Sequence, residues 1–345
     1  MMRRIAFRVD ASPVAGQGHL SRCLALASRL HARDTQCHFV GTHALAPWVA
    51  DIETAGHRVS LIREDLAASE DAVETIRVLE GPADWLVVDH YGLDACWHKV
   101  VRPSAPRLLV IDDLANRPLA ADAVLDPSPC ADMQAYRKLA PAAKLLLGPS
   151  WCLLRKEFAE ARRRAPHKET PDFSPRIHLA LGGTDYANAT VPLARGLLEW
   201  FEGVRIMAVL GHEGPQAAAL RELATTSNGR LELVVATREV AATMAVCNCA
   251  VGAPGGTLWE RFCMGLPTAC VSTAPTQRPV IERLAHAGWL LDLGEASDFG
   301  KGTREALARW LSSPAALYAQ RERLVEAVDG LGADRLVDWL VERAR

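Results

Sequence analysis

The chain has 345 residues, 49% of them hydrophobic and 23% charged, so it can bury cores for two domains of ordinary size. Its net charge of −2 offers no general attraction to nucleic acid, and no apolar run is long enough to span a bilayer. Met1–Arg4 leads directly into a strand pattern, and nine cysteines are scattered without zinc-type spacing. We therefore expect a cytoplasmic protein with reduced thiols, no nucleic-acid partner and no stable membrane insertion.

Strand-like runs alternate with helical patterns through the first half of the chain, which predicts a parallel sheet with helices on both faces. The expected strands are Ile5–Val9, Gln36–Val40, Arg58–Ile62, Trp85–Val88, Leu108–Ile111 and Lys144–Leu147. A charged helix follows and ends at Arg162–Arg164, before a stretch rich in proline and polar residues. We expect an N-terminal domain over residues 1–165 and a linker over 166–175.

A second set of strands and helices follows the linker. The expected strands are Ile177–Leu181, Arg205–Leu210, Leu231–Val235, Cys249–Val251, Thr268–Val271 and Leu290–Leu291. They predict a C-terminal domain over residues 176–330, followed by a C-terminal helix within 331–345. The predicted fold class is therefore α/β, with two doubly wound, Rossmann-like domains.

The loop between the first strand and the first helix carries Gly16, Gly18 and His19. The glycines allow close approach of a ligand, and the helix N-terminus that follows suits phosphate. Because a positive helix end disfavours imidazolium, we expect His19 to be neutral near pH 7 and able to accept a proton. A lone histidine here could also only pack the helix start. The loop lacks the third glycine of a dinucleotide fingerprint, and the second strand ends in Gly41-Thr42 without an acid for a ribose.

Polar residues follow two other strands of the first half. Asp89, His90 and Tyr91 come directly after a buried strand, on the same sheet edge as the His19 loop. Asp112 and Asp113 follow the next strand. For these two acids, capping of the next turn is the favoured interpretation.

Two further glycine turns lie in the second half, after the strands that end near residues 181 and 251. The second of them continues into Thr257-x-x-Glu260, which matches a capping box, so Glu260 could serve only its own helix start. Equally, a carboxylate one turn inside a helix could bind two vicinal hydroxyls, and the two interpretations can coexist. Three glycine turns at one cleft suggest a diphosphate ligand. There is no Gly-Lys-Ser/Thr loop and no clear cluster of metal-binding acids.

Seven motifs in order give the chain a specific resemblance. They are Asp10-Ala11-Ser12 through Gly16-x-Gly18-His19-x-x-Arg22-Cys23-Leu24, Asp89-His90-Tyr91-Gly92-Leu93, Asp112-Asp113-Leu114-Ala115, Gly148-Pro149 with Leu153-Leu154-Arg155-x-Glu157-Phe158, Gly182-Gly183-Thr184-Asp185, Gly255-Gly256-Thr257-x-Trp259-Glu260, and Asp329-Gly330-x-Gly332-Ala333. Over nearly its whole length the chain resembles the PseG-type UDP-sugar hydrolases of pseudaminic acid biosynthesis. These are relatives of MurG-like glycosyltransferases with the GT-B fold.

The resemblance implies two domains facing each other across a cleft and hydrolysis of UDP-2,4-diacetamido-2,4,6-trideoxy-β-L-altropyranose to UDP and the free sugar, without a cofactor or metal. The family's loop histidine, its general base, matches His19, and a sugar-pocket tyrosine matches Tyr91. Gly256 and Thr257 match the diphosphate loop of GT-B relatives, and Glu260 matches their ribose ligand.

The matched motifs imply further substrate contacts. These residues are Asp10, Gly16, Gly18, Arg155, Gly182, Gly183, Thr184, Asp185, Asn188, Gly255 and Gln277. The chain departs from the family at Thr276, where Asn is frequent, and in Gly182-Gly183-Thr184, where Gly-Gly-Ser is common. The first departure changes one polar contact to sugar or water, on which the exact substrate depends.

Two other classes of function stay open. In an inverting glycosyltransferase on the same scaffold, an acceptor hydroxyl would replace the water and His19 could serve equally as base. A membrane-docking patch would favour that function, but amphipathic segments such as Leu45–Ala55 more often face a core. The second class is a UDP-sugar-binding protein without catalysis. Within the hydrolase class, the substrate could also be a related UDP-sugar.

The glycine turns predict that the activity does not require a metal ion. Because backbone N–H groups and helix N-termini supply the counter-charge to the diphosphate, UDP release from the sugar nucleotide should survive excess EDTA. UDP release is measured before and after chelation. A complete loss that magnesium restores would contradict this expectation.

Overall fold

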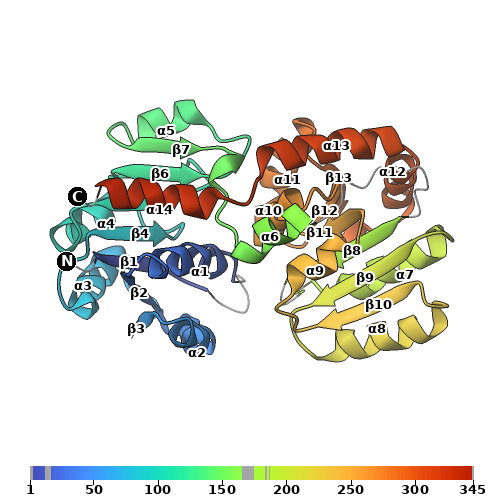
Figure 1. Ribbon diagram of the computed structural model, residues 1–345, viewed down its shortest axis with the longest axis horizontal. Coiled ribbons are helices and arrows are strands. Elements are labelled where there is room, and N and C mark those ends of the chain that lie inside the picture. Colours follow the sequence, from blue (N-terminus) through green and yellow to red (C-terminus); the bar gives the residue numbers. More distant parts are fainter. Residues whose placement is uncertain (1–2, 12–16, 165–174, 183–184, 186, 344–345) are drawn as a thin grey trace. The chain divides into compact units, whose positions relative to one another are not determined.

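Figure 1 shows the computed structural model, which describes residues 3–11, 17–164, 175–182, 185 and 187–343. The chain divides into two compact units, one formed by Met1–Arg155 with Gly330–Arg345 and the other by Lys156–Asp329. Among the helices that are described, none combines the length and the apolar character needed to cross a membrane.

The first unit contains a parallel sheet with strand order β3-β2-β1-β4-β5-β6-β7, counted over the described residues. Its strands are β1 (Arg3–Val9), β2 (Thr35–Thr42), β3 (Arg58–Ile62), β4 (Trp85–Asp89), β5 (Leu108–Ile111), β6 (Ala123–Asp126) and β7 (Lys144–Leu147). The six strands expected from the sequence are confirmed. The sequence analysis missed β6, which is defined by its pairing with β5 and β7.

Helices cover both faces of this sheet. They are α1 (Gly18–His31), η1 (His43–Trp48), α2 (Val49–Thr54), α3 (Ala68–Leu79), α4 (Ala95–Val101), η2 (Arg102–Ser104), α5 (Met133–Leu139), η3 (Pro149–Trp151) and α14 (Gly332–Arg343). One core cluster joins Phe7 to α1 and α14, and the other joins Val88 to α3 and α4. The expected helix Leu45–Ala55 begins as a 3-10 turn containing Pro47, and its apolar side chains Leu45 and Ile52 are buried in the core.

The last helix of the chain packs into the first unit. In Figure 1 the red α14 lies among the blue and green elements of that unit. Arg29 of α1 forms an ion pair with Asp334 at 3.2 Å, and the rings of Trp85 and Trp339 lie 5.4 Å apart. The unit therefore closes with a segment that is distant in sequence from the rest of its core.

The second unit contains a parallel sheet with strand order β10-β9-β8-β11-β12-β13, again over the described residues. Its strands are β8 (Arg176–Ala180), β9 (Arg205–Leu210), β10 (Leu231–Val235), β11 (Cys249–Gly252), β12 (Thr268–Ser272) and β13 (Leu291–Glu295). Its helices are α6 (Lys156–Arg164), α7 (Thr190–Trp200), α8 (Pro215–Thr226), α9 (Val240–Ala245), α10 (Gly256–Cys263), η4 (Pro275–Gln277), α11 (Arg278–His286), η5 (Ala296–Asp298), α12 (Lys301–Leu311) and α13 (Pro314–Ala327). The strands match the sequence expectation with shifts of one to a few residues at their ends.

The division between the units falls after Arg155, whereas the sequence places it at residue 165. The difference is helix α6, which packs with the second unit. Its Arg162 guanidinium donates to the carbonyl oxygens of Val325 and Val328 at 2.6 and 2.8 Å. The predicted linker lies, apart from Pro175, outside the described residues.

Both sheets are built around a reversal of strand order. In the first unit the chain runs outward from β1 to β3 and then returns to pair β4 with β1. In the second it runs from β8 to β10 and returns to pair β11 with β8. Loops diverge at such a switch point, which is where open α/β sheets bind ligands. Most of the predicted site residues follow these four central strands, whereas Arg155 comes after β7 and Gln277 after β12.

The packing of α14 predicts an effect of one substitution. A Cβ at Gly332 would lie 2.7 Å from the Trp151 carbonyl carbon and 2.8 Å from the Cys152 backbone nitrogen. Because these are backbone atoms, Gly332→Ala should displace α14 and lower the unfolding free energy by about 1–3 kcal/mol. Denaturant unfolding measures this change.

The matched control is Gly302→Ala, at an exposed position near the start of α12, where a Cβ meets nothing within 4 Å. There we expect an unchanged or raised stability, by at most about 1 kcal/mol, because alanine favours helix. Equal effects of the two substitutions would show that the approach of Gly332 to Trp151 and Cys152 does not hold α14 in place.

Candidate functional site

A fully buried carboxylate, Asp89, lies at the switch point of the first unit, as the last residue of β4. The Arg22 guanidinium donates to it in bidentate fashion, from Nε at 2.7 Å and from Nη2 at 2.6 Å. The Cys23 thiol lies 3.5 Å from the Asp89 Oδ2. Burial alone would raise the pKa of Asp89, but the charge of Arg22, with the contributions of His19 and the hydrogen bonds from Arg22 and Cys23, keeps this pKa below its ordinary value. Asp89 is therefore a carboxylate anion.

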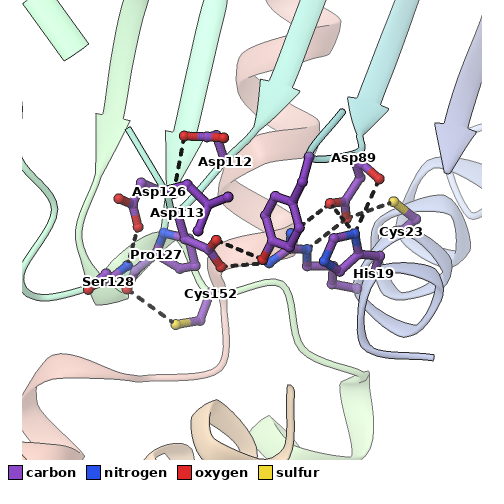
Figure 2. Close-up of polar contacts among 12 residues, drawn as sticks. His19, Cys23, Asp89, Asp112, Asp113, Asp126, Pro127, Ser128 and Cys152 are labelled. Atoms are coloured by element: carbon purple, nitrogen blue, oxygen red, sulfur yellow. Dashed lines mark hydrogen bonds and ion pairs between the residues drawn. The ribbon is translucent and has the colours of Figure 1, made fainter. Parts of the chain in front are cut away.

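His19, the predicted general base, is the second residue of α1 and is about one-quarter exposed. Its Nδ1 lies 3.2 Å from the Asp89 Oδ1 and 3.3 Å from the Asp89 carbonyl oxygen (Figure 2). With Nδ1–H donated to these acceptors, Nε2 is the nitrogen that can accept a proton. The sequence predicted a proton acceptor from the helix end alone and missed the carboxylate that orients it.

Tyr91 and Asp113 extend this group of residues. The Tyr91 ring stands edge-on to His19 with centroids 4.7 Å apart, and its hydroxyl donates to the Asp113 Oδ1 at 2.7 Å. Arg22 Nη1 lies 3.7 Å from the Asp113 Oδ2, so one guanidinium faces both acids. For Asp113 the turn-capping interpretation is thus wrong, because its carboxylate pairs with a tyrosine. For Asp112 it is confirmed, since this side chain accepts the backbone N–H of Ala115 at 2.9 Å.

Asp10, a predicted substrate contact, is held at the end of β1 by three partners. Its carboxylate accepts the Thr42 N–H at 2.6 Å and an Arg8 N–H at 2.8 Å, and it lies 3.4 Å from the Nε2 of His90. Burial opposes ionisation, but the contacts with His90 and Arg8 lower the pKa of Asp10 well below its ordinary value. A Cβ at Gly41 would approach the Val9 carbonyl to 2.6 Å, so only glycine fits beside Asp10.

A second buried acid, Asp71, forms an ion pair with Arg8. Asp71 of α3 accepts from the Arg8 Nε at 3.2 Å and Nη2 at 2.6 Å, and from the Trp97 indole N–H at 2.8 Å. The carboxyl end of β1 is therefore tied to both α3 and α4. Nothing in the sequence pattern indicates this pair, because Arg8 has the place of an ordinary strand residue.

A proton is shared among three side chains at the ends of β5 and β6. The Tyr136 hydroxyl lies 2.9 Å from the Asp112 Oδ2 and 3.1 Å from the Asp126 Oδ2, and it has only one proton to donate. The Ser128 N–H occupies the Asp126 Oδ1 at 2.8 Å. Burial raises the pKa of Asp126 to about 7, so below that pH a proton on its Oδ2 can supply the second hydrogen bond.

The first glycine turn of the second unit follows β8. Gly182 has φ of +105°, a conformation that favours glycine, and Gly183 and Thr184 lie outside the described residues, as does Gly16 in the first unit. The buried Asp185 accepts the N–H groups of Ala189 and Thr190 at 3.1 and 2.9 Å, so it caps α7. Asn188 accepts from the Gln216 amide at 3.1 Å. Substrate contacts by Asp185 and Asn188 stay predictions.

The second glycine turn leads from β11 into α10. Gly255 is the N-cap, and Gly256 and Thr257 are the first two helical residues. The capping-box interpretation is therefore wrong, because the N-cap of the helix is Gly255 and not Thr257. Glu260 lies one turn further on and is buried, with 8% of its surface exposed. Its predicted role as a ribose ligand is untested by these contacts.

The remaining predicted contacts lie at three separate places. Gly18 is the first residue of α1, and Arg155 is the last residue of the first unit before α6. Gln277 ends η4 after β12, and its Oε1 accepts the Thr273 N–H at 2.8 Å. Within the described ranges, no group of three or more His, Cys, Asp or Glu is arranged to hold a metal ion.

Comparison with known proteins places the sequence among distant relatives. No protein-family model matches the chain. An uncharacterized protein of Methanocaldococcus jannaschii is 23% identical over 286 residues, which are 80% of this chain and 57% of that protein. The UDP-2,4-diacetamido-2,4,6-trideoxy-β-L-altropyranose hydrolase of Campylobacter jejuni is 25% identical over 197 residues, 56% of this chain and 65% of the hydrolase. The chain thus spans less than two thirds of the length of either relative.

Comparison with solved structures identifies the fold. MurG of Acinetobacter baumannii matches with a TM-score of 0.70 at 14% identity, over 99% of both chains. The UDP-GlcNAc 2-epimerase of Neisseria meningitidis, solved with UDP-GlcNAc, matches with a TM-score of 0.63 at 13% identity, over 99% of this chain and 100% of the other. The chain therefore has the predicted GT-B-like fold of two Rossmann-like, parallel-sheet domains.

The protonated Asp126 predicts a pH dependence of stability. Its pKa is about 7 in the folded protein and about 3.9 when unfolded, so between these values the native state holds a proton that the unfolded chain has released. Stability is therefore lost as pH rises through this window. Asp126→Asn does not titrate, so its melting temperature relative to wild type should increase from about pH 5 to pH 8.

The control is Asp132→Asn, an exposed cap of α5 that asparagine can replace. Its difference from wild type should stay level over the same range. If the Asp126→Asn difference is equally level, Asp126 is ionised throughout and the shared-proton arrangement is wrong.

Proposed function

We propose that the chain hydrolyses a UDP-sugar at the anomeric C–O bond and releases UDP and the free sugar. The arrangement that supports this proposal is His19 oriented by the buried Asp89 at the switch point of the first sheet. A base held by a carboxylate in this way is a recurrent means of activating a hydroxyl or a water. The distant sequence relation to the Campylobacter hydrolase supports the same reaction.

In the proposed step, His19 Nε2 takes a proton from a water whose oxygen forms a bond to the anomeric carbon. The bond between that carbon and the diphosphate oxygen breaks, and its electron pair leaves with UDP. Asp89 stabilises the imidazolium that forms, while Arg22 keeps Asp89 ionised. Direct displacement inverts the configuration at the anomeric carbon.

Tyr91 is proposed to contact the sugar. Its hydroxyl proton is engaged by Asp113, so the phenol oxygen is left to accept a hydrogen bond from a hydroxyl or amide N–H. Its ring is 41% exposed beside His19, so a ligand can reach it. This arrangement suits a sugar with acetamido groups.

The second unit is proposed to bind the nucleotide. The first residues of α10, after the glycine turn that follows β11, have backbone N–H groups without intrahelical partners, and the helix directs its positive end at that loop. These groups would stabilise the charge on the departing diphosphate without a metal, and Glu260 would bind the ribose. The specific substrate that we propose is UDP-2,4-diacetamido-2,4,6-trideoxy-β-L-altropyranose, in a cytoplasmic step of pseudaminic acid biosynthesis.

The likeness to MurG favours one alternative, an inverting glycosyltransferase in which an acceptor hydroxyl replaces water. Incubation with UDP-sugars in the absence of acceptor separates the two. UDP release without acceptor supports the hydrolase, and release only with acceptor supports the transferase. Binding without release in either case would leave a UDP-sugar-binding protein.

Substitution of His19 tests the base. His19→Asn keeps a polar side chain but cannot accept the proton at neutral pH, so turnover should fall by about two to four orders of magnitude with UDP affinity retained. The control is His43→Asn, an exposed histidine of the same unit, which should leave turnover unchanged. Near-normal turnover in His19→Asn would remove His19 from this role.

An isotope experiment identifies the bond that breaks. When hydrolysis runs in heavy-oxygen water, the label should enter the sugar and not UDP, because attack occurs at carbon. Free product incubated in the same water corrects for exchange through the ring-opened sugar. Label in UDP would mean attack at phosphorus and would contradict the proposed step.

A further inference from the structure

The loop between β11 and α10 surrounds a guanidinium that has no counter-ion. Arg261 of α10 is fully buried, with 0% of its surface exposed. Its Nη2 donates to the Ala253 carbonyl at 2.7 Å, whereas its Nε and Nη1 have no hydrogen-bond partner. Among the described residues, no carboxylate lies within ion-pair distance of this side chain.

The loop itself is shaped around this side chain. A Cβ at Gly252 would overlap the Arg261 Nη1, so residue 252 is glycine because the guanidinium takes that space. The same Cβ would lie 2.5 Å from the Ala180 carbonyl oxygen at the end of β8. The guanidinium therefore lies at the switch point of the second sheet, against the loop that enters α10.

Two polar neighbours of Arg261, His178 and Cys270, are neutral at physiological pH. Burial, followed by the charge of Arg261, lowers the pKa of His178 to about 3, so its ring carries no charge. Burial raises the pKa of the Cys270 thiol, which lies 3.9 Å from Nη2, to about 11. The carboxylate of Glu260, the preceding residue, also attracts Arg261. Burial of a charge without a close partner costs free energy, so an anion bound at the loop would be stabilising.

We propose that Arg261 is a phosphate-recognition residue, whose buried charge acts with the α10 N-terminus to bind the diphosphate group of a nucleotide at the Gly252–Gly256 loop. An arginine is protonated at neutral pH even where burial opposes it, so the charge is permanent. In a buried, low-dielectric position it attracts an anion at the loop more strongly than a surface cation does. The identification of the ligand as UDP rests on the proposed function.

Arg261→Met tests this proposal by two measurements, ligand affinity, which should fall, and melting temperature, which should not. Calorimetric titration should show affinity for UDP and for inorganic diphosphate reduced about tenfold or more, with uridine affinity within about twofold of wild type. The melting temperature of the unliganded variant should equal or exceed that of wild type, because an unpaired buried charge has been removed. Arg261→Lys, which keeps the charge, should retain most of the preference for UDP over uridine.

The matched control is Arg162→Met, in the same unit. Arg162 donates to three backbone carbonyls, of Cys263, Val325 and Val328, so its loss should lower the melting temperature and leave the ratio of UDP to uridine affinity unchanged. If Arg261→Met behaves like this control, Arg261 is structural and the proposal is overturned. Should Arg261→Met fail to fold, Arg261→Gln, which keeps a donor for Ala253, makes the same comparison.

Failure of this inference and failure of the proposed function give different results. Binding is measured without turnover, so a protein that binds diphosphate through Arg261 yet releases no sugar overturns the hydrolase alone. Hydrolysis with equal UDP affinity in wild type and Arg261→Met overturns the phosphate role alone. A wild-type protein that binds neither UDP nor inorganic diphosphate overturns the inference as well.

Discussion

The buried Asp89 carboxylate is the interaction on which the first unit's site depends. A carboxylate that is buried away from water needs hydrogen-bond donors to stay ionised. Helix α1 supplies them from one face, because His19, Arg22 and Cys23 are spaced i, i+3 and i+4. The pairing fixes the rotation of α1 against β4. The contact of Asp89 with the His19 Nδ1 also leaves Nε2 as the ring nitrogen able to accept a proton, so one carboxylate orients both the helix and the imidazole.

A second layer of buried polar contacts supports that site. Arg8 forms ion pairs with Asp10 at the loop and with Asp71 on α3, and the Trp97 indole N–H donates a further hydrogen bond to Asp71. Removing one member of such a network leaves a buried polar group without a partner, which lowers stability. When every group has its hydrogen bonds, the network is rigid. They hold the strand ends in place, so that the loops alone are left to meet a ligand.

The two units use the same topology for different chemistry. Each has its strand order reversed about a central pair, β1 with β4 and β8 with β11, and each has its candidate loops there. The first unit gathers titratable side chains at this point. The second has glycine turns, a helix N-terminus and the buried Arg261. In the proposed reaction, the first unit would supply the proton transfer and the second unit would bind the anion.

The sequence by itself determined the α/β class, the two sheets, and the strand ends at which the site residues lie, because hydrophobic periodicity and glycine turns are local signals. It also predicted His19 and Tyr91 as candidate site residues, because they follow strands at the sheet edge where open α/β sheets bind ligands. Tertiary structure alone decided that Asp89 orients His19, that Asp113 pairs with Tyr91 and not with its own turn, and that α10 begins before Thr257. It alone revealed β6 and the buried Arg261. The physical reason is that a charge's partners come from residues distant in the chain, so its burial and its pairing appear only when the strands and helices are packed.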